Sequence, residues 1–160
     1  MELRSEVANM DAARKLQQYT IDDIYALPDG ERAELIDGRL YNMAPPNRIH
    51  QKLVQQLSLT IGNYITSHGG VCEVYPAPFA VNLDSDDKDW VEPDISVICD
   101  KNKLTDRGCS GAPDFIIEIV SSSSRKMDYS IKNALYSESG VREYWIVGRQ
   151  PQQASATAIA

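Results

Sequence analysis

The chain has 160 residues and a formal net charge of −7, with 42% hydrophobic and 24% charged residues. This length suits one domain with a core of its own, and the hydrophobic fraction excludes a wholly disordered chain. No apolar run approaches the roughly 20 residues that a membrane helix needs, and residues 1–20 lack the apolar core of a secretory signal. We therefore expect a cytoplasmic, single-domain protein that does not enter a membrane.

The negative charge is concentrated in the middle of the sequence. Residues 73–114 contain ten acidic and four basic side chains, whereas residues 115–150 contain four acidic and five basic ones. The acidic run at 84–89 is typical of a solvated loop. A net negative charge argues against non-specific coating of nucleic acid, because such binding depends on neutralising phosphates.

The first part of the chain predicts a short helix and a hairpin. Thr20 has the pattern of a helix N-cap, with Asp23 three positions later. Asp37 and Gly38 stand between two runs that contain apolar residues, which is typical of a two-residue turn with positive φ at both positions. The polar residues 1–18 before them indicate a loose helix or a mobile arm.

The rest of the chain predicts strands around two helices. Apolar residues at helical spacing predict a helix from His50 to Ser67 and another from Met127 to Ser139. The order indicates an α/β or α+β fold with a mixed sheet flanked by helices. The predicted strands lie within residues 71–83, 90–99, 114–120 and 142–147. We divide the chain into an arm (1–18), one domain (19–149) and a low-complexity tail (150–160), which we expect to be disordered or loosely attached.

The three cysteines predict no special chemistry. Cys72, Cys99 and Cys109 make an odd number without C-x-x-C spacing, so neither a disulfide framework nor a zinc site is indicated. Cys99 is expected to pack as a small hydrophobic residue.

Two acidic residues interrupt apolar strand patterns. Asp94 lies in the predicted strand that includes Ile95, and Glu118 lies in the run from Phe115 to Val120. A buried carboxylate must be paired, hydrogen-bonded or bound to a cation. If the two strands are neighbours, both carboxylates could bind a hard divalent ion. Alternatively, Asp94 caps a turn and Glu118 pairs with an arginine.

Several segments, in this order, resemble a known family over about residues 19–148. They are Tyr19-Thr20, Leu27-Pro28, residues 33–40, Glu92-Pro93-Asp94, residues 113–121 and residues 140–145. The family is Uma-two (Uma2), a family of restriction-endonuclease-like proteins assigned to the PD-(D/E)XK nuclease superfamily. The resemblance implies a mixed sheet flanked by helices and a nuclease active site.

The resemblance also assigns site residues. Asp94 resembles the motif aspartate, Glu118 resembles the first acid of the (D/E)-x-K element, and Glu34 would be an auxiliary acid. The usual lysine position is occupied by Val120, and the resemblance implies that the family's lysine has moved to the following helix, where Lys132 lies at the matching place. The alternative for Lys132 is an ordinary exposed lysine.

Two further sets of residues are weaker candidates for the site. Arg125 and Lys126 are either phosphate contacts or a solvated basic pair, and His50 resembles a family histidine but has no partner in the sequence. Relatives usually continue with more strand-forming sequence after residues 142–147. We therefore expect that strand edge to be covered by a partner subunit or by the tail.

Together these residues indicate an endonuclease that hydrolyses phosphodiester bonds of DNA with Mg²⁺ or Mn²⁺ held by Asp94 and Glu118. Lys132 would orient or deprotonate the attacking water or stabilise the phosphate charge, and Glu34 would assist directly or through water. We expect DNA as the partner and a homodimer as the assembly. The alternatives are an inactive binding or dimerisation module with the nuclease fold, and a hydrolase of small phosphodiesters.

Overall fold

The computed structural model describes residues 18–121, 124–148 and 154–158 of the chain. The expected arm lies outside these residues except for Gln18, and so do residues 150–153, 159 and 160 of the tail. The helices are α2 (Ile21–Tyr25), α3 (Arg48–Ser67) and α4 (Asn133–Glu138), with a 3-10 turn η1 (Lys101–Lys103) and a π-helical segment η2 (Met127–Lys132). The strands are β1 (Ala33–Ile36), β2 (Arg39–Asn42), β3 (Glu73–Pro76), β4 (Ala80–Asn82), β5 (Ile95–Ile98), β6 (Leu104–Thr105), β7 (Gly108–Ser110), β8 (Phe115–Ile119), β9 (Glu143–Val147) and β10 (Ala154–Ala158).

The first two predicted elements are confirmed. Thr20 is the N-cap of α2, and its backbone N–H donates to Asp23 Oδ2 at 2.8 Å. The β1–β2 hairpin turns at Asp37 and Gly38, whose φ angles are 47° and 70°. Two positive φ angles are what the short turn requires, which explains why the sequence signal was sufficient.

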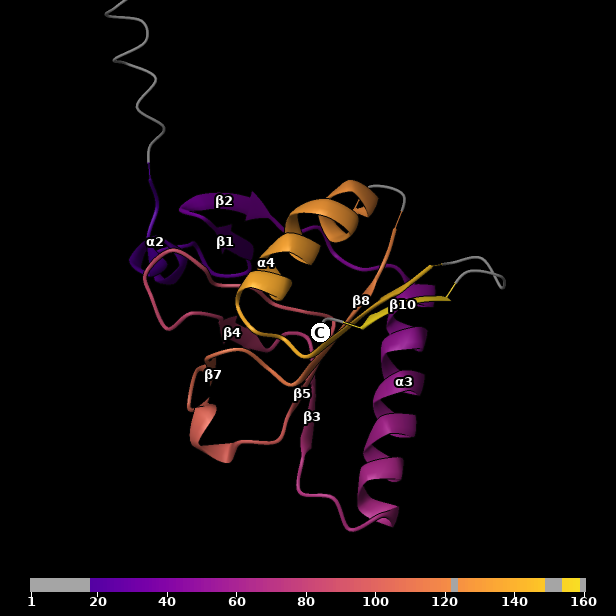
Figure 1. Ribbon diagram of the computed structural model, residues 1–160. Helices are drawn as coiled ribbons and strands as arrows, with labels where there is room; N and C mark the ends of the chain where they lie inside the picture. The colour runs from indigo at the N-terminus through magenta and orange to yellow at the C-terminus, as the bar shows by residue number, and fades with distance from the viewer. Residues whose placement is uncertain (1–17, 122–123, 149–153, 159–160) are drawn as a thin grey trace, which may run out of the picture.

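A mixed five-stranded sheet forms the centre of the described structure, in the order β10-β9-β8-β5-β3. The pair β8–β9 is parallel and the other pairs are antiparallel. The ribbon shows the sheet running diagonally through the molecule, with the smaller sheet β4-β7-β6 to one side (Figure 1). The predicted fold class, a mixed α+β domain, is confirmed.

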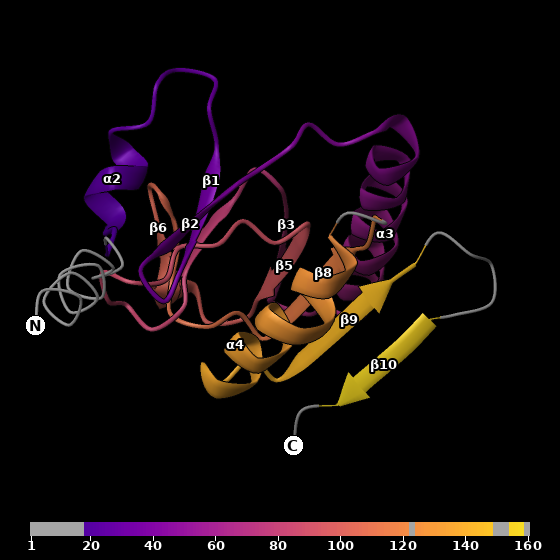
Figure 2. The ribbon, with the colours of Figure 1, turned by 90° about the horizontal axis from the view of Figure 1, so that it is seen from above.

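Helices cover the two faces of the central sheet, as Figure 2 shows. On one face, Val54 and neighbouring apolar residues of α3 pack against Ile95 of β5 and Ile117 of β8. On the other face, Tyr136 of α4 packs in a larger core with Ile116 of β8. Adjacent residues of β8 thus face opposite helices, as expected for a strand that is covered on both sides.

Gly108 shows where two backbones approach closely. Its φ is 141°, and a Cβ atom at this position would lie 2.1 Å from the carbonyl oxygen of Ala80. The parallel pairing of β4 with β7 therefore requires glycine here.

Three local features differ from the sequence prediction. The single predicted helix from Met127 begins as the π-helical η2 and continues as α4. Asp94 directly precedes β5 instead of lying within a strand from residue 90 to 99. Residues 90 and 91, predicted to be part of that strand, make only isolated bridges. Residues 154–158 of the tail were expected to be disordered or loosely attached. They form β10 and pair with β9, the strand whose edge was expected to be covered. The expectation that a partner subunit or the tail covers this edge of β9 is met by the tail, because its backbone pairs with the groups that β9 would otherwise leave unpaired.

Cys72 and Cys99 form a disulfide bond with a Cα–Cα distance of 3.9 Å, so the interpretation of Cys99 as a packing residue was wrong. Glu73 of β3 lies opposite Ile98 of β5, and antiparallel pairing brings the residue before Glu73 opposite the residue after Ile98. The two cysteines are 27 positions apart, so their spacing in the sequence did not indicate the disulfide. Cys109 is free and buried.

We expect the double variant Cys72→Ser/Cys99→Ser to be less stable than the oxidised protein by about 3 kcal/mol, because the bond closes a loop of 27 residues in the unfolded chain. Urea denaturation with and without dithiothreitol measures this effect. Reductant should lower the midpoint of the wild-type protein and leave that of the variant unchanged. Equal wild-type midpoints in both conditions would contradict the bond.

No helix within the described residues is both long and apolar enough to cross a bilayer.

Candidate functional site

Glu118 lies at the centre of a buried polar cluster. Its neighbours Ile117 and Ile119 pack toward α3, so the alternation of β8 directs Glu118 to the face that α4 covers. The residue is 3% exposed. Its Oε1 accepts hydrogen bonds from Lys132 Nζ at 2.8 Å and from the Tyr136 hydroxyl at 2.7 Å. Glu118 therefore pairs with a lysine, and the alternative of an arginine partner was wrong.

Lys132 lies among three acidic side chains. Its Nζ is 2.9 Å from Glu34 Oε2, 2.8 Å from Glu118 Oε1 and 4.0 Å from Asp128 Oδ1. Glu34 comes from β1 and also accepts a hydrogen bond from the backbone N–H of Glu92. Lys132 is 5% exposed, so the alternative of an ordinary surface lysine was wrong.

Asp94 borders this cluster and is partly open to solvent, with 17% of its side chain exposed. Its Oδ2 accepts the backbone N–H of Ile119 at 2.7 Å and lies 3.0 Å from His50 Nε2. Its own backbone N–H lies 3.3 Å from Glu118 Oε2. The structure thus brings Asp94, Glu118, Glu34 and Lys132 into one contiguous set.

The electrostatics of the site follow from an excess of acid. Burial raises the pKa of Glu118 to about 8, although the charge of Lys132 offsets part of that effect. Burial by itself lowers the pKa of Lys132, but the carboxylates of Glu118 and Glu34 outweigh it and hold that pKa well above its ordinary value. Burial also raises the pKa of Asp128. Lys132 therefore keeps its proton, and the surrounding acids favour the arrival of further positive charge.

Three residues in or beside the cluster carried weak sequence signals. Asp128 and Tyr136 share one helix face with Lys132 at i, i+4 and i+8, but nothing in the sequence showed that this face meets Glu118. His50, in the first turn of α3, has Asp94 as its partner, and this hydrogen bond raises the pKa of His50. The two residues are 44 positions apart, so spacing could not reveal the pair.

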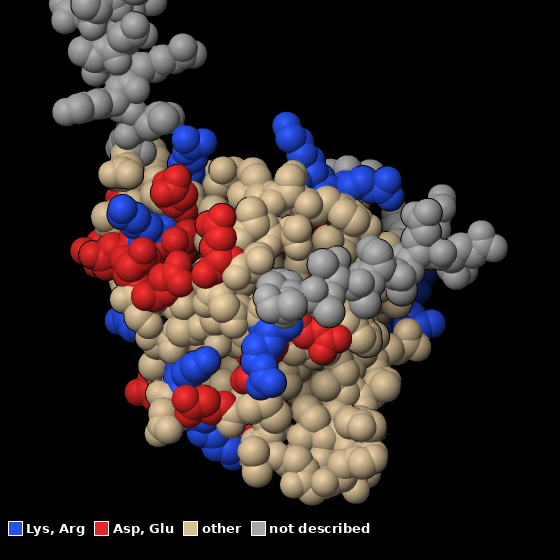
Figure 3. Space-filling model, in the orientation of Figure 1, with Lys and Arg blue, Asp and Glu red and all other residues tan. Residues whose placement is uncertain are grey.

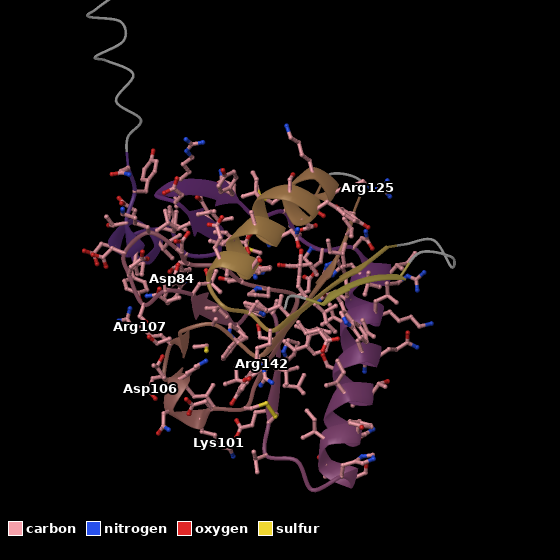
Figure 4. All side chains as sticks on the ribbon, viewed as in Figure 1. Asp84, Lys101, Asp106, Arg107, Arg125 and Arg142 are labelled. Carbon is pink, nitrogen blue, oxygen red and sulfur yellow. A yellow bond between two sulfur atoms is a disulfide. The ribbon has the colours of Figure 1, made fainter. Side chains whose placement is uncertain are left out.

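The basic residues Arg125 and Lys126 lie apart from this cluster. Both are exposed beside the start of η2, and Arg125 stands at the outer surface of the molecule (Figure 4). Acidic side chains gather on the side of the molecule that carries α2, whereas lysines and arginines stand along the upper edge of the same view (Figure 3). On the face shown, the upper edge is therefore more favourable to a polyanion than the side that carries α2 (Figure 3).

The carboxylates of Asp94 and Glu118 suit a divalent ion that takes only one or two of its ligands from the protein. Within the described part of the chain, no group of three or more His, Cys, Asp or Glu side chains is arranged to hold a metal. Mg²⁺ is often bound by only one or two carboxylates, together with waters and substrate phosphates. Asp94 and Glu118 supply hard oxygen ligands of this kind on neighbouring segments.

Comparisons with known proteins identify the family of the chain. A family model described as "Uma2: Putative restriction endonuclease" matches residues 16–157. The chain belongs to the Uma2 family. The resemblance inferred from the sequence motifs is thereby confirmed, and it covers nearly the whole chain.

Two relatives extend this assignment. An uncharacterised protein, slr1290, of Synechocystis sp. (strain ATCC 27184 / PCC 6803 / Kazusa) is 24% identical over 117 residues, which are 73% of this chain and 60% of that protein. This chain thus spans about 60% of that relative's length. A solved structure from Anabaena variabilis ATCC 29413, described as a putative nuclease belonging to DUF820, matches with a TM-score of 0.65 at 18% identity, covering 87% of this chain and 84% of that one. At this identity the match establishes the shared fold.

Proposed function

We propose that this Uma2 protein is an endonuclease that hydrolyses phosphodiester bonds of DNA with Mg²⁺ or Mn²⁺. The observation that carries the proposal is the buried ammonium of Lys132, held between Glu118 and Glu34 beside the partly exposed Asp94. A cation and several carboxylates on one face of a mixed sheet suit a reaction in which negative charge develops on a phosphate. The family description supports the same class of activity.

Asp94 and Glu118 would hold the divalent ion. When bound, the ion would polarise a phosphoryl oxygen and lower the pKa of a coordinated water. The exposure of Asp94 gives a phosphate access to the site from its side, whereas Glu118 is closed off beneath α4.

Lys132 would stabilise the developing charge on the phosphate and orient the attacking water. Its raised pKa keeps the ammonium protonated, which favours these roles over removal of a proton from water. Glu34 would keep Lys132 in place, since it accepts from the same ammonium. Arg125 and Lys126 would contact flanking phosphates from the exposed start of η2.

A homodimer is part of the proposal, because two-fold dimers are the commonest assemblies among soluble oligomers. An inactive module with the nuclease fold is the second candidate function. The observation in its favour is that the ammonium of Lys132 already has carboxylate partners, which is also how a purely structural ion pair would look.

Purified wild-type protein, incubated with supercoiled plasmid and single-stranded DNA, is expected to cleave DNA with Mg²⁺ or Mn²⁺ and to leave it intact with EDTA. A generic small phosphodiester serves as the comparison substrate. Turnover of that compound without DNA retardation at low salt would favour a small-substrate hydrolase. DNA binding without any cleavage would favour the inactive module.

A further inference from the structure

In each of the two carboxylates proposed to hold the ion, one oxygen takes most of the hydrogen bonds. Glu118 Oε1 accepts from both Lys132 and Tyr136, while its Oε2 has only the 3.3 Å contact with the backbone N–H of Asp94. Asp94 Oδ2 has two partners, and no hydrogen bond from a described residue reaches its Oδ1. Among the described residues, each carboxylate therefore has one oxygen with two partners and a second oxygen with at most one long contact.

The position of the Tyr136 hydroxyl is set by the core around it. The side chain is fully buried, and its ring makes an edge-to-face contact with Tyr144 at a centroid distance of 4.9 Å. The Tyr136 hydroxyl donates to Glu118 Oε1 at 2.7 Å. A rigid ring with one proton can direct that proton to one oxygen only.

Lys132 alone would orient Glu118 less well. Its ammonium is shared with Glu34, and it is carried on a flexible stem with three rotatable donors. The terminal torsion of a glutamate side chain is broad, so a carboxylate held by one shared ammonium can turn. A second donor on the same oxygen fixes the plane of the carboxylate.

We propose that Tyr136 is a positioning residue whose hydroxyl fixes the Glu118 carboxylate, so that Oε2 faces Asp94 and a divalent ion held there. The inference rests on the proposed function in assigning that ion to Asp94 and Glu118. Tyr136 does not touch substrate, and it acts through the orientation of Glu118.

Tyr136→Phe removes the hydroxyl and keeps the ring in the core. We expect this variant to bind Mn²⁺ about 10- to 100-fold more weakly than the wild-type protein, as is typical when the partner of a metal ligand is lost. Isothermal titration calorimetry on folded protein measures the affinity. If Tyr136→Phe binds Mn²⁺ as tightly as the wild type, the proposal is overturned.

Tyr144→Phe is the matched control. The Tyr144 hydroxyl is also buried in this ring pair, but it donates to the backbone oxygen of Asp128 at 3.0 Å instead of to a carboxylate. Both variants are expected to lose some stability, and only Tyr136→Phe is expected to lose Mn²⁺ affinity. Equal losses of affinity in the two variants would assign Tyr136 a structural role and overturn the proposal.

A crystal structure of ion-free Tyr136→Phe separates this inference from the proposed function. A turned Glu118 carboxylate, compared with the ion-free wild type, supports the positioning role, and an unchanged carboxylate overturns it. The proposed function fails on a different result, namely a wild-type protein that binds no divalent ion or an Asp94→Asn variant that binds it equally well.

Discussion

Replacing Lys132 by methionine is expected to destabilise the folded protein by about 3–5 kcal/mol at pH 8 and to abolish cleavage. The substitution leaves Glu34, Glu118 and Asp128 in a buried space without their common cation. Methionine fills most of the volume of the lysine stem, so the loss comes from charge and not from a cavity. Urea denaturation followed by circular dichroism measures the change.

The loss of stability in Lys132→Met, relative to the wild type, should grow above about pH 8. Glu118 already has a raised pKa of about 8 in the folded protein, and removal of the ammonium that lowers it raises it further. A carboxyl group with a raised folded-state pKa binds more protons in the folded than in the unfolded state. Through Glu118, the wild-type protein and the variant therefore lose stability in parallel up to about pH 8. Above that pH only the variant continues to lose stability, by at most about 1.4 kcal/mol per pH unit.

The matched control is Lys126→Met, which removes an exposed lysine at the start of the same helical segment. It is expected to change stability by no more than about 0.5 kcal/mol at any pH. If Lys132→Met unfolded at the same urea concentration as Lys126→Met at pH 8, the central role of the buried ammonium would be wrong.

Asp94→Asn is expected to reduce DNA cleavage about 10³-fold or more and to weaken Mn²⁺ binding, with little effect on stability. The loss corresponds to about 4 kcal/mol of transition-state stabilisation, within what a metal ion supplies to phosphoryl chemistry. Asparagine has nearly the same shape, and its amide oxygen can still accept the backbone N–H of Ile119. The substitution therefore removes charge while preserving the local fold.

Asp87→Asn is the control for overall charge. Asp87 lies exposed in the acidic loop and makes no hydrogen bond or ion pair with another described residue. The variant carries the same net charge as Asp94→Asn and should cleave DNA at the wild-type rate in a gel assay. Equal rates for wild type, Asp87→Asn and Asp94→Asn would falsify the assignment of Asp94 as an ion ligand.

Local patterns in the sequence predicted much of the fold. The Asp37-Gly38 turn, the helical spacing in α3 and the apolar run of β8 each depend on residues close together in the chain, and all three elements are present. The same patterns brought out the two acids at Asp94 and Glu118, because a charged residue beside buried strand positions stands out against its neighbours. The order of the segments that contain them also pointed to the family, which the family model confirms.

Pairings between distant residues could not be predicted from such patterns. Lys132 and Glu34 are 98 positions apart, and their contact depends on how the β1–β2 hairpin and η2 meet over the central sheet. The disulfide between Cys72 and Cys99 depends on the register of β3 against β5, since a shift of one residue would separate the two cysteines. Tyr136 is another such case, because its role beside Glu118 can be inferred only from the structure, which shows that its hydroxyl donates to Glu118 Oε1.

The sequence by itself determined the fold class and the family, because alternation, turn chemistry and motif order are local properties of the chain. It also predicted the acids and the lysine of the candidate site, with Glu34 and Lys132 assigned only through the family resemblance. Only the tertiary structure decided that Lys132 is buried between Glu118 and Glu34, that Asp94 keeps an exposed side, and that Tyr136 and His50 each engage one carboxylate. The physical reason is that burial and pairing arise from packing between segments far apart in the chain. In this cluster, packing sets which groups hold their protons and which oxygens are available to a ligand.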